Sequence, residues 1–164
     1  MRNNNQGFTL LELMIAVVVL TVLAMIAIPM YQAYVARADQ AQAQAQMLML
    51  AERLENYRSR QLNYAGFEAE YESATEPGVI YLPRGSDATQ YRYKIQLLDL
   101  NQPHSLQQSV IGQGWKMIAT PQQFGSRVLR ESPSYLLSSR QQQCATLSLL
   151  SSTAQDCGQD AQTW

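Results

Sequence analysis

Residues 8–28 read FTLLELMIAVVVLTVLAMIAI, and this stretch decides the architecture of the chain. Glu12 is its one charged residue, and from Leu13 onward only Thr21 is even mildly polar. About 20 predominantly apolar residues can cross a bilayer as a helix. The remainder, residues 31–164, is polar enough to be soluble. The sequence therefore predicts one N-terminal membrane segment joined to one exported domain.

Averages over the whole chain hide this division. The 164 residues carry 12 basic and 13 acidic side chains, for a net charge of −1, and the mean hydropathy is −0.23. Charged residues make up 15% of the chain, below the roughly 25% of ordinary soluble domains. The balanced charge argues against a dedicated nucleic-acid-binding protein, which carries a clear basic excess. A single apolar run of this length also excludes a protein with several membrane spans.

Glu12 is the anomaly of the apolar stretch. A charged side chain at the centre of a membrane-spanning helix costs about 2.5–3.5 kcal/mol and marks a candidate functional residue. The alternative is a shallow position in the first turn of the helix, where the carboxylate gains modestly from the helix dipole. A cleavable secretory signal is an alternative for the whole stretch, since residues 24–27 loosely resemble its cleavage site. The length of the apolar run and the carboxylate inside it argue against such a signal.

The segment GFTLLELMI at residues 7–15 follows a short polar leader with one basic side chain. It resembles the class III signal of type IV prepilins. The resemblance implies cleavage between Gly7 and Phe8 by a prepilin peptidase, N-methylation of Phe8, and pairing of Glu12 with the methylated amine of a neighbouring subunit. A carboxylate and an ammonium are strongly coupled in an apolar medium, so this pair would check the register of assembly.

The same resemblance divides the chain into three parts. Residues 1–7 would be a leader that the peptidase removes, residues 8–29 an apolar helix in the membrane or the filament core, and residues 30–164 a head domain. The protein would be a single-pass inner-membrane protein with its head in the periplasm, and after assembly a part of the extracellular pilus. Its partners would be other major and minor pilins, the prepilin peptidase and N-methyltransferase, the inner-membrane assembly platform, and membrane lipid before assembly.

Helical sequence continues beyond Pro29. Residues 36–60 contain neither Gly nor Pro, and one apolar face follows the 3–4 spacing of an amphipathic helix. We expect this face to pack on a sheet; its residues are Ala43, Met47, Leu50, Leu54 and Tyr57. The helix should run from about Thr9 to about Arg60, on the order of 75–80 Å at 1.5 Å per residue. Pro29 should kink the helix or melt it locally, because proline lacks a backbone donor and clashes with the preceding turn.

Strand signals fill the second half of the chain. Four segments have the alternation or apolar content of short strands: 79–82, 90–98, 115–120 and 145–150. A small antiparallel sheet needs a cover on its apolar face, and the amphipathic half of the helix provides one. The predicted fold class is therefore α+β, with a long N-terminal helix packed on a small antiparallel sheet, and the resemblance implies the αβ-roll of type IV pilins. Residues 122–143 are expected to form an exposed loop.

Cys144 and Cys157 are the two cysteines of the chain. In a domain that faces an oxidising compartment such a pair predicts a disulfide, with two unrelated free thiols as the alternative. The bond would close a loop over residues 144–157 and pin a polar tail that ends at Trp164. We expect the Trp164 side chain to tuck onto the domain, with a subunit contact as the alternative.

The sequence contains no catalytic or cofactor-binding constellation. His104 is the single histidine, so a zinc site lacks ligands, and no Gly-rich phosphate loop is present. Four clustered glutamates match no calcium-loop spacing and should form a solvated acidic face: Glu68, Glu70, Glu72 and Glu76. We therefore expect no cofactor, no metal and no enzymatic activity.

Three further segments, residues 44–64, 115–121 and 144–150, are similar to the subgroup of type IV pilins that includes PilE-type minor pilins. The implied function is that of a structural subunit of a type IV pilus. We interpret the chain as a minor pilin that primes assembly or joins the filament or tip complex, for adhesion, twitching motility or DNA uptake. A type II secretion pseudopilin has the same N-terminal signal and remains an alternative.

A DNA-receptor pilin for natural transformation is another alternative. It would need a basic stripe, because phosphate contacts dominate DNA affinity. The candidates for such a stripe are Arg127, Arg130, Arg140 and Lys116. Glu131 interrupts them and the chain is net acidic, so nucleic acid is not an expected partner.

Overall fold

A computed structural model describes residues 8–164 of the chain. The leader, including Gly7 of the expected cleavage site, lies outside the described residues. The described part of the chain divides into two compact units, with the boundary between Val35 and Ala36. Helix α1 (Leu10–Gln61) belongs to both units, and all five strands belong to the second. The two units are the apolar segment and the head.

Helix α1 confirms the predicted long helix, with each end within one residue of the expected position. It is continuous through Pro29, so the local melting proposed for this position is not observed. A bend at Pro29 stays a prediction. The helix ends at Gln61. The next residue, Leu62, donates its amide to the carbonyl of Arg58 and has a φ of 65°, in the left-handed region. A left-handed residue just past the last turn is a common helix stop.

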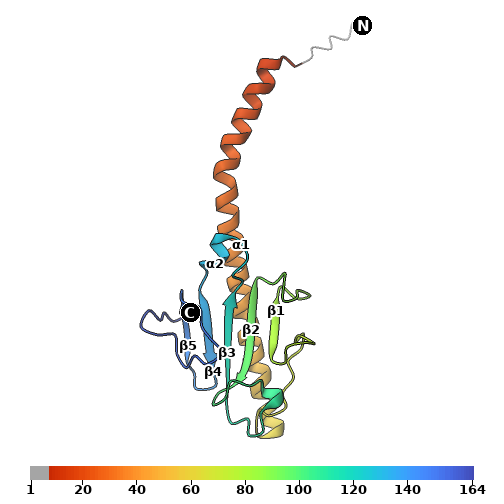
Figure 1. Cartoon of the computed structure of the whole chain (residues 1–164), viewed down its shortest axis with the longest axis vertical. Helices are drawn as coiled ribbons and strands as arrows, with labels where there is room; N and C mark the ends of the chain where they lie inside the picture. The colour runs from red at the N-terminus through yellow and green to blue at the C-terminus, as the bar shows by residue number, and fades with distance from the viewer. Residues whose placement is uncertain (1–7) are drawn as a thin grey trace. The chain divides into compact units, whose positions relative to one another are not determined.

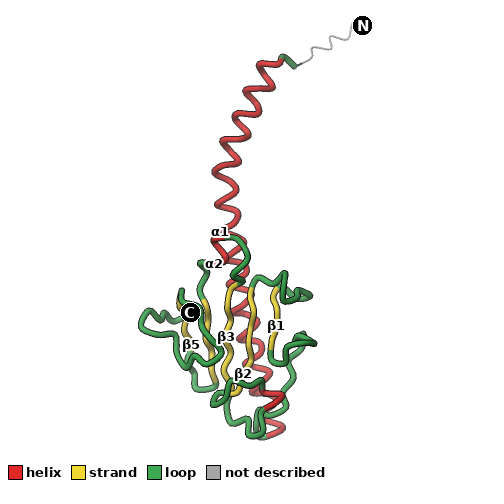
Figure 2. The backbone as a smooth tube through the Cα atoms, in the orientation of Figure 1, coloured by secondary structure: helices red, strands yellow, loops and turns green. Residues whose placement is uncertain are grey.

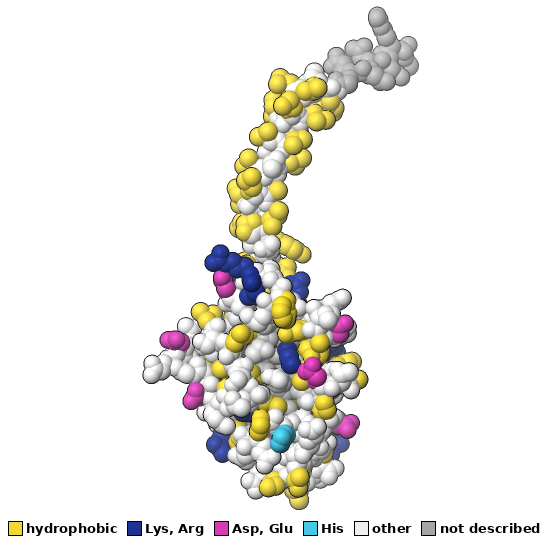
Figure 3. Space-filling model, in the orientation of Figure 1, with side chains coloured by type: hydrophobic (Ala, Val, Ile, Leu, Met, Phe, Trp, Pro, Cys, Tyr) yellow, Lys and Arg dark blue, Asp and Glu magenta, His cyan; other side chains and the backbone are white. Residues whose placement is uncertain are grey.

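The apolar segment exposes nearly all its side chains within the chain. An 18-residue window of this part of α1 is 0% buried and apolar enough to cross a membrane by length and composition. Exposed hydrophobic side chains follow one another along this part of the helix, and Figure 3 shows them on the visible face. A helix that is apolar all round needs an apolar environment. The described residues of the chain do not provide it, so the environment must come from lipid or from another chain.

The head contains a five-stranded antiparallel meander (Figure 1). Sheet neighbours follow the chain order, and the strands are β1 (Val79–Leu82), β2 (Tyr93–Asp99), β3 (Trp115–Pro121), β4 (Ser134–Ser138) and β5 (Gln143–Thr146). Two short helical turns connect them, η1 (Leu106–Gln108) before β3 and α2 (Arg127–Arg130) before β4. Figure 2 shows the C-terminal half of α1 lying along one face of these strands. The structure therefore confirms the α+β fold class.

Two of the loop and strand predictions were wrong. Residues 122–143 are not an exposed loop, because they contain α2 and the fully buried strand β4. The five residues of β4, SYLLS, are too few for a periodicity signal, and their burial depends on the strands on both sides. The predicted strand at 145–150 starts earlier and is shorter, because β5 covers Gln143–Thr146. Leu147 and Leu149 lie outside it and are exposed.

The main core lies between α1 and the sheet. The predicted helix face is buried, since Ala43, Met47, Leu50 and Leu54 each have 0% exposure. Tyr57 is half-buried at the end of this face, where its ring makes an edge contact with Phe67 and its hydroxyl donates to the Ala65 carbonyl. The residues opposite come from alternate positions of the strands and include Tyr93, Ile95, Leu97, Trp115, Met117, Ala119, Tyr135 and Leu137.

A smaller core covers the other face of the sheet. Leu98, Ile118 and Leu136 pack there against Cys157. The half-buried side chains of Cys144, Leu150 and Ala154 complete this cluster. The loop between the two cysteines therefore folds back over the sheet, so both faces of the sheet are covered.

Candidate functional site

The first turn of α1 holds the candidate assembly residue. Thr9 precedes the helix, and its hydroxyl accepts a hydrogen bond from the Glu12 amide at 3.3 Å. The order Thr-Leu-Leu-Glu is that of a capping box, in which the N-cap hydroxyl satisfies an otherwise unpaired amide and the carboxylate lies at the positive end of the helix. The structure therefore places Glu12 in the first turn of α1. A shallow depth of this carboxylate in a membrane stays a prediction. The capping role of Thr9 was not predicted from the sequence, although the Thr-x-x-Glu spacing is a signal for it.

The side chains around Glu12 are available to partners outside the chain. Phe8 is 82% exposed, and Leu11 and Leu13 are also exposed. Within residues 8–164 no cation forms an ion pair with the Glu12 carboxylate. Among the described residues the site is thus an apolar helix end with one carboxylate that forms no ion pair.

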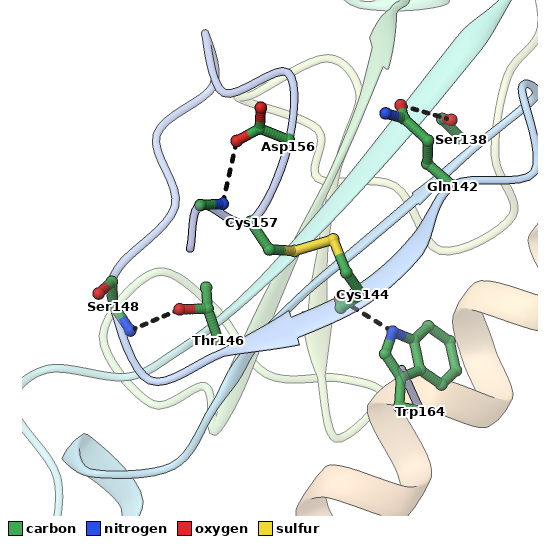
Figure 4. The surroundings of a disulfide bond; sticks show 9 residues. Ser138, Gln142, Cys144, Thr146, Ser148, Asp156, Cys157 and Trp164 are labelled. Atoms are coloured by element: carbon green, nitrogen blue, oxygen red, sulfur yellow. Dashed lines mark hydrogen bonds between the residues drawn. A yellow bond between two sulfur atoms is a disulfide. The ribbon is translucent and has the colours of Figure 1, made fainter. Parts of the chain in front are cut away.

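The disulfide joins Cys144 at β5 to Cys157, with 2.01 Å between the sulfur atoms and 6.1 Å between the Cα atoms. Both cysteines form this bond, so the predicted pairing is present and the free-thiol alternative is excluded. Figure 4 shows the bond beside the tail that follows it. The bond holds the loop against the smaller core of the sheet.

The tail after the disulfide closes the β5 edge. Ala145 and Gln162 exchange two backbone hydrogen bonds, of 2.7 and 2.9 Å. Trp164 donates its indole N–H to the Cys144 carbonyl at 3.0 Å (Figure 4), and its ring meets Tyr135 at 69° with 5.4 Å between centroids. Trp164 therefore tucks onto the head, as the sequence predicted. A groove of about 410 Å³ lies beside it, and its lining includes Tyr135, Gln44 and Asp160.

A polar seam joins α1 to the sheet near the start of the head. The Gln40 amide donates to the Ser132 hydroxyl at 3.1 Å. One carboxylate oxygen of Asp39 is buried without a hydrogen-bond partner, and it lies 3.7 Å from the Arg92 guanidinium. Burial raises the pKa of Asp39, and the positive charge of Arg92 opposes this shift. Burial also raises the pKa of Tyr93, whose hydroxyl donates to the Pro133 carbonyl.

Comparisons with known proteins connect both units to one class. Residues 2–28 match the model of the prokaryotic N-terminal methylation motif. Residues 29–148 match the family described as type IV minor pilin ComP, DNA uptake sequence receptor. The chain belongs to this type IV minor pilin family. It is thus a structural subunit of the type IV pilus class, as the sequence predicted, and the comparisons do not favour the pseudopilin alternative.

Curated relatives of the pilin match parts of it. The type IV major pilin protein PilA of Myxococcus xanthus (strain DK1622) is 38% identical over 84 residues, which are 51% of this chain and 38% of that protein. A fimbrial protein of Moraxella nonliquefaciens is 51% identical over 41 residues, or 25% of this chain and 27% of the relative. The type IV major fimbrial protein FimA of Dichelobacter nodosus is 54% identical over 39 residues, or 24% of this chain and 25% of the relative. No solved structure gives a significant match.

The basic side chains of the pilin do not gather into the stripe considered from the sequence. Arg127 and Arg130 belong to α2, which precedes β4, whereas Arg140 follows β4. The strand's five residues separate these positions by roughly 15 Å. Arg127 is also paired with Glu131 at 2.7 Å, and Lys116 is buried. The proposed set of four is therefore not a continuous basic surface.

Three of the four glutamates of the expected acidic face make specific contacts within the head. Glu70 pairs with Arg53 of α1, and Glu76 pairs with Lys94 of β2 at 3.0 Å. These contacts lower the pKa of both carboxyls. The Glu72 carboxylate accepts from the Ala69 and Gly78 amides and shapes the turn before β1. Within the described residues these glutamates do not form a metal-binding group.

Proposed function

We propose that this pilin is a minor subunit that the inner membrane holds by residues 8–29 before assembly and that a filament holds by the same residues afterwards. The observation that carries the proposal is the apolar, exposed first half of α1, joined to a head whose own core is complete. In lipid, this half would be solvated by acyl chains. In a filament, it would pack against the equivalent helices of other major and minor pilins.

Processing comes first in the proposed sequence of events. A prepilin peptidase and N-methyltransferase would cleave the chain between Gly7 and Phe8 and methylate the new amine of Phe8. The match of residues 2–28 to the N-terminal methylation motif supports this step. The 82% exposure of Phe8 supports it as well, because an enzyme must reach this residue. Cleavage converts Phe8 into a positively charged end four residues before Glu12.

Assembly then depends on Glu12. Its carboxylate would pair with the methylated amine of Phe8 in the adjacent subunit, delivered by the inner-membrane assembly platform. An ion pair in an apolar medium adds little net stability, but an unpaired charge there is costly. The pair would therefore reject subunits that are out of register. The Thr9 cap supports this role, because it holds the first turn of the helix in one conformation without using the carboxylate oxygens.

The head would face the periplasm before assembly and the outside of the cell afterwards. Its disulfide supports this location, because such bonds form and persist in oxidising compartments. The sequence contains no recognisable set of catalytic residues. We therefore propose a structural role without enzymatic activity.

The test is a comparison of Glu12→Ala with Glu52→Ala, an exposed glutamate on the head half of the same helix. Glu12→Ala should leave membrane insertion and leader cleavage intact and reduce the amount of this pilin in sheared filaments at least tenfold. Glu52→Ala should match the wild type in all three measurements. Normal incorporation of Glu12→Ala would contradict the assembly role.

Capture of DNA is the second candidate function. The observation that favours it is the match of residues 29–148 to a family described as a DNA uptake sequence receptor. The net charge of −1 and the dispersed basic side chains favour the opposite outcome. Binding of duplex DNA to the full chain, measured from 50 to 200 mM salt, separates the two. A receptor retains sequence-dependent binding at the higher salt, whereas the charge distribution alone predicts negligible binding there.

A further inference from the structure

Lys116 occupies an unusual position for a charged side chain. It belongs to β3, pairs with Leu98 on one side and Ser138 on the other, and is 3% exposed. Lysine is almost never this buried unless it is paired. The residue faces the side of the sheet that the disulfide loop covers, because its nitrogen reaches the Ala154 carbonyl of that loop.

The ammonium group of Lys116 has one partner in the described part of the chain. It donates one hydrogen bond, to the Ala154 carbonyl at 3.0 Å. A lysine ammonium has three donors, so two remain. No carboxylate of residues 8–164 lies within ion-pair distance of it. Burial lowers the pKa of Lys116, and without a counter-charge the ammonium is costly to keep.

A small cavity lies next to this ammonium. Its volume is about 110 Å³, and it is lined by Asn101, Gln102, Pro103, Lys116, Thr153 and Gln155. Two of these residues flank Ala154, whose carbonyl holds the ammonium at the cavity wall. The lining comes from two segments far apart in sequence, the turn after β2 and the disulfide loop. Only their packing on the sheet brings them together.

The lining offers hydrogen-bond donors and no negative charge. The residues with side-chain amides, Asn101, Gln102 and Gln155, are exposed, so their N–H groups are accessible to a ligand in the cavity. Each amide nitrogen carries two donors. Together with the two unused ammonium protons, these groups match an anion with several acceptor oxygens. Three titratable residues lie close to the lining in sequence, His104, Asp156 and Asp99, and none of them lines the cavity. The Asp99 carboxylate is nevertheless near, because it accepts a hydrogen bond from the Asn101 backbone amide at 2.8 Å.

We propose that this cavity, the Lys116 pocket, is a binding site for a single phosphate group. Charge complementarity selects an anion, because Lys116 is the one charged residue of the lining. A phosphate presents three or more strong acceptor oxygens and can meet donors from both segments, whereas a carboxylate presents two. Lysine binds phosphate as a point charge, which suits a buried ammonium. Duplex DNA is a poor occupant, because it needs several basic contacts along its backbone and this pocket has one.

Phosphate binding in the Lys116 pocket would be separate from the assembly role. Glu12 and the apolar segment take no part in the pocket. A phosphate bridging the turn after β2 to the disulfide loop would stabilise the head, because a ligand that binds only the folded state shifts the folding equilibrium.

The sequence makes the test direct, since Lys94 and Lys116 are its two lysines. Lysine labelled with ¹³C and ¹⁵N gives two side-chain signals from the full chain in a nonionic detergent. Inorganic phosphate, added at constant ionic strength, should shift the Lys116 signal saturably and raise its pKa by about 1 unit, as an adjacent opposite charge does. Lys94, which already pairs with Glu76, is the matched control and should not respond.

A second measurement uses the variants. Phosphate should raise the melting temperature of the wild type and of Lys94→Met, and should leave that of Lys116→Met unchanged. Lys116→Met keeps the length of the side chain and removes the buried charge, so it should fold. Equal shifts of both lysine signals, or an equal response to acetate, would overturn the proposal. A response to duplex DNA without a response to inorganic phosphate would also overturn it, and would assign the lysine to DNA contact instead.

Discussion

The two halves of helix α1 have the same secondary structure and opposite surroundings. Side chains such as Leu20 and Leu23 in the first half are 65% and 58% exposed, whereas Leu50 and Leu54 in the second half have 0% exposure. Both halves are rich in helix-favouring residues. The difference lies in the partner, because the second half finds its sheet in the same chain and the first half finds none there. The stability of one half is therefore a property of the fold, and that of the other a property of the membrane or the filament.

The largest effect should come from the buried helix face. Leu50→Ala removes a fully buried side chain and should lower the free energy of unfolding of the head by about 2–5 kcal/mol. Urea unfolding of the full chain in nonionic detergent, followed by the fluorescence of Trp115 and Trp164, measures this. Leu20→Ala, the same substitution on the exposed half, should leave the unfolding curve unchanged. Equal destabilisation by both would remove the distinction between the two halves.

The disulfide should rank second. Replacement of Cys144 and Cys157 by Ser opens the loop and should lower the stability of the head by about 3 kcal/mol. The loss should be local, so that amides of residues 145–164 exchange faster while those of α1 keep their protection. Hydrogen exchange with and without the bond tests this. A cooperative loss of all helical protection on reduction would show that the loop supports the main core as well.

Trp164 should have a smaller effect. Trp164→Ala removes the edge contact with Tyr135 and the bond to the Cys144 carbonyl, and should cost about 1–3 kcal/mol. Trp164→Phe keeps an aromatic ring without the N–H, and should recover part of the loss. The same urea titration, read from Trp115 alone, measures both variants. If Trp164→Ala unfolds like the wild type, the tail is not part of the head's core.

The smallest effect should come from Asp39 and should depend on pH. Its pKa is raised in the folded head, so the folded state binds this proton more tightly than the unfolded chain does. Stability should therefore rise as pH falls through the folded pKa, and the penalty for the charged form should be fully present near pH 7. Asp39→Asn should stabilise the head at pH 7 by less than about 1 kcal/mol. The advantage should shrink as pH falls and vanish below about pH 3, where Asp39 is protonated in both the folded and the unfolded state.

The control for Asp39 is Asp87, whose pKa is shifted in the opposite direction. Hydrogen bonds from Thr89 lower the pKa of Asp87, so its contribution is present at neutral pH and is lost as pH falls through the folded pKa. Asp87→Asn should therefore reduce stability at pH 7 and have less effect in acid. Unfolding curves at about pH 2 and pH 7 for both variants test the two signs, because both carboxyls are largely protonated at the lower pH. The same sign for both would contradict the assigned causes.

Much of the head could be predicted because its signals are local. The 3–4 spacing of the helix face located the core side of α1, and the segment 79–82 matched β1 residue for residue. The segment 122–143 failed for the opposite reason. Strand β4 has five residues, and its ladder partners lie on β3 and β5. A short strand of this kind is defined by its neighbours and carries little periodicity of its own.

The two candidate sites also differ in whether their residues lie close together in the sequence. Gly7, Phe8 and Glu12 were recognisable because they lie together in one short motif. The Lys116 pocket was not, because its walls come from positions near 101 and near 154. From the sequence Lys116 was an ordinary basic residue and a candidate for DNA contact. Its burial depends on the neighbouring strands β2 and β4 and on the disulfide loop that covers this face of the sheet.

The amino-acid order alone determined the long helix, its apolar first half, the buried face of its second half and the match to the N-terminal methylation motif at its start. Each of these features depends on residues that are contiguous or spaced at the helical period, so helix geometry is enough to predict it. The meander order, the burial of β4, the cover of the disulfide loop and the isolation of the Lys116 ammonium were decided by tertiary structure. They depend on contacts between residues tens of positions apart, and no local spacing encodes which of those contacts form together.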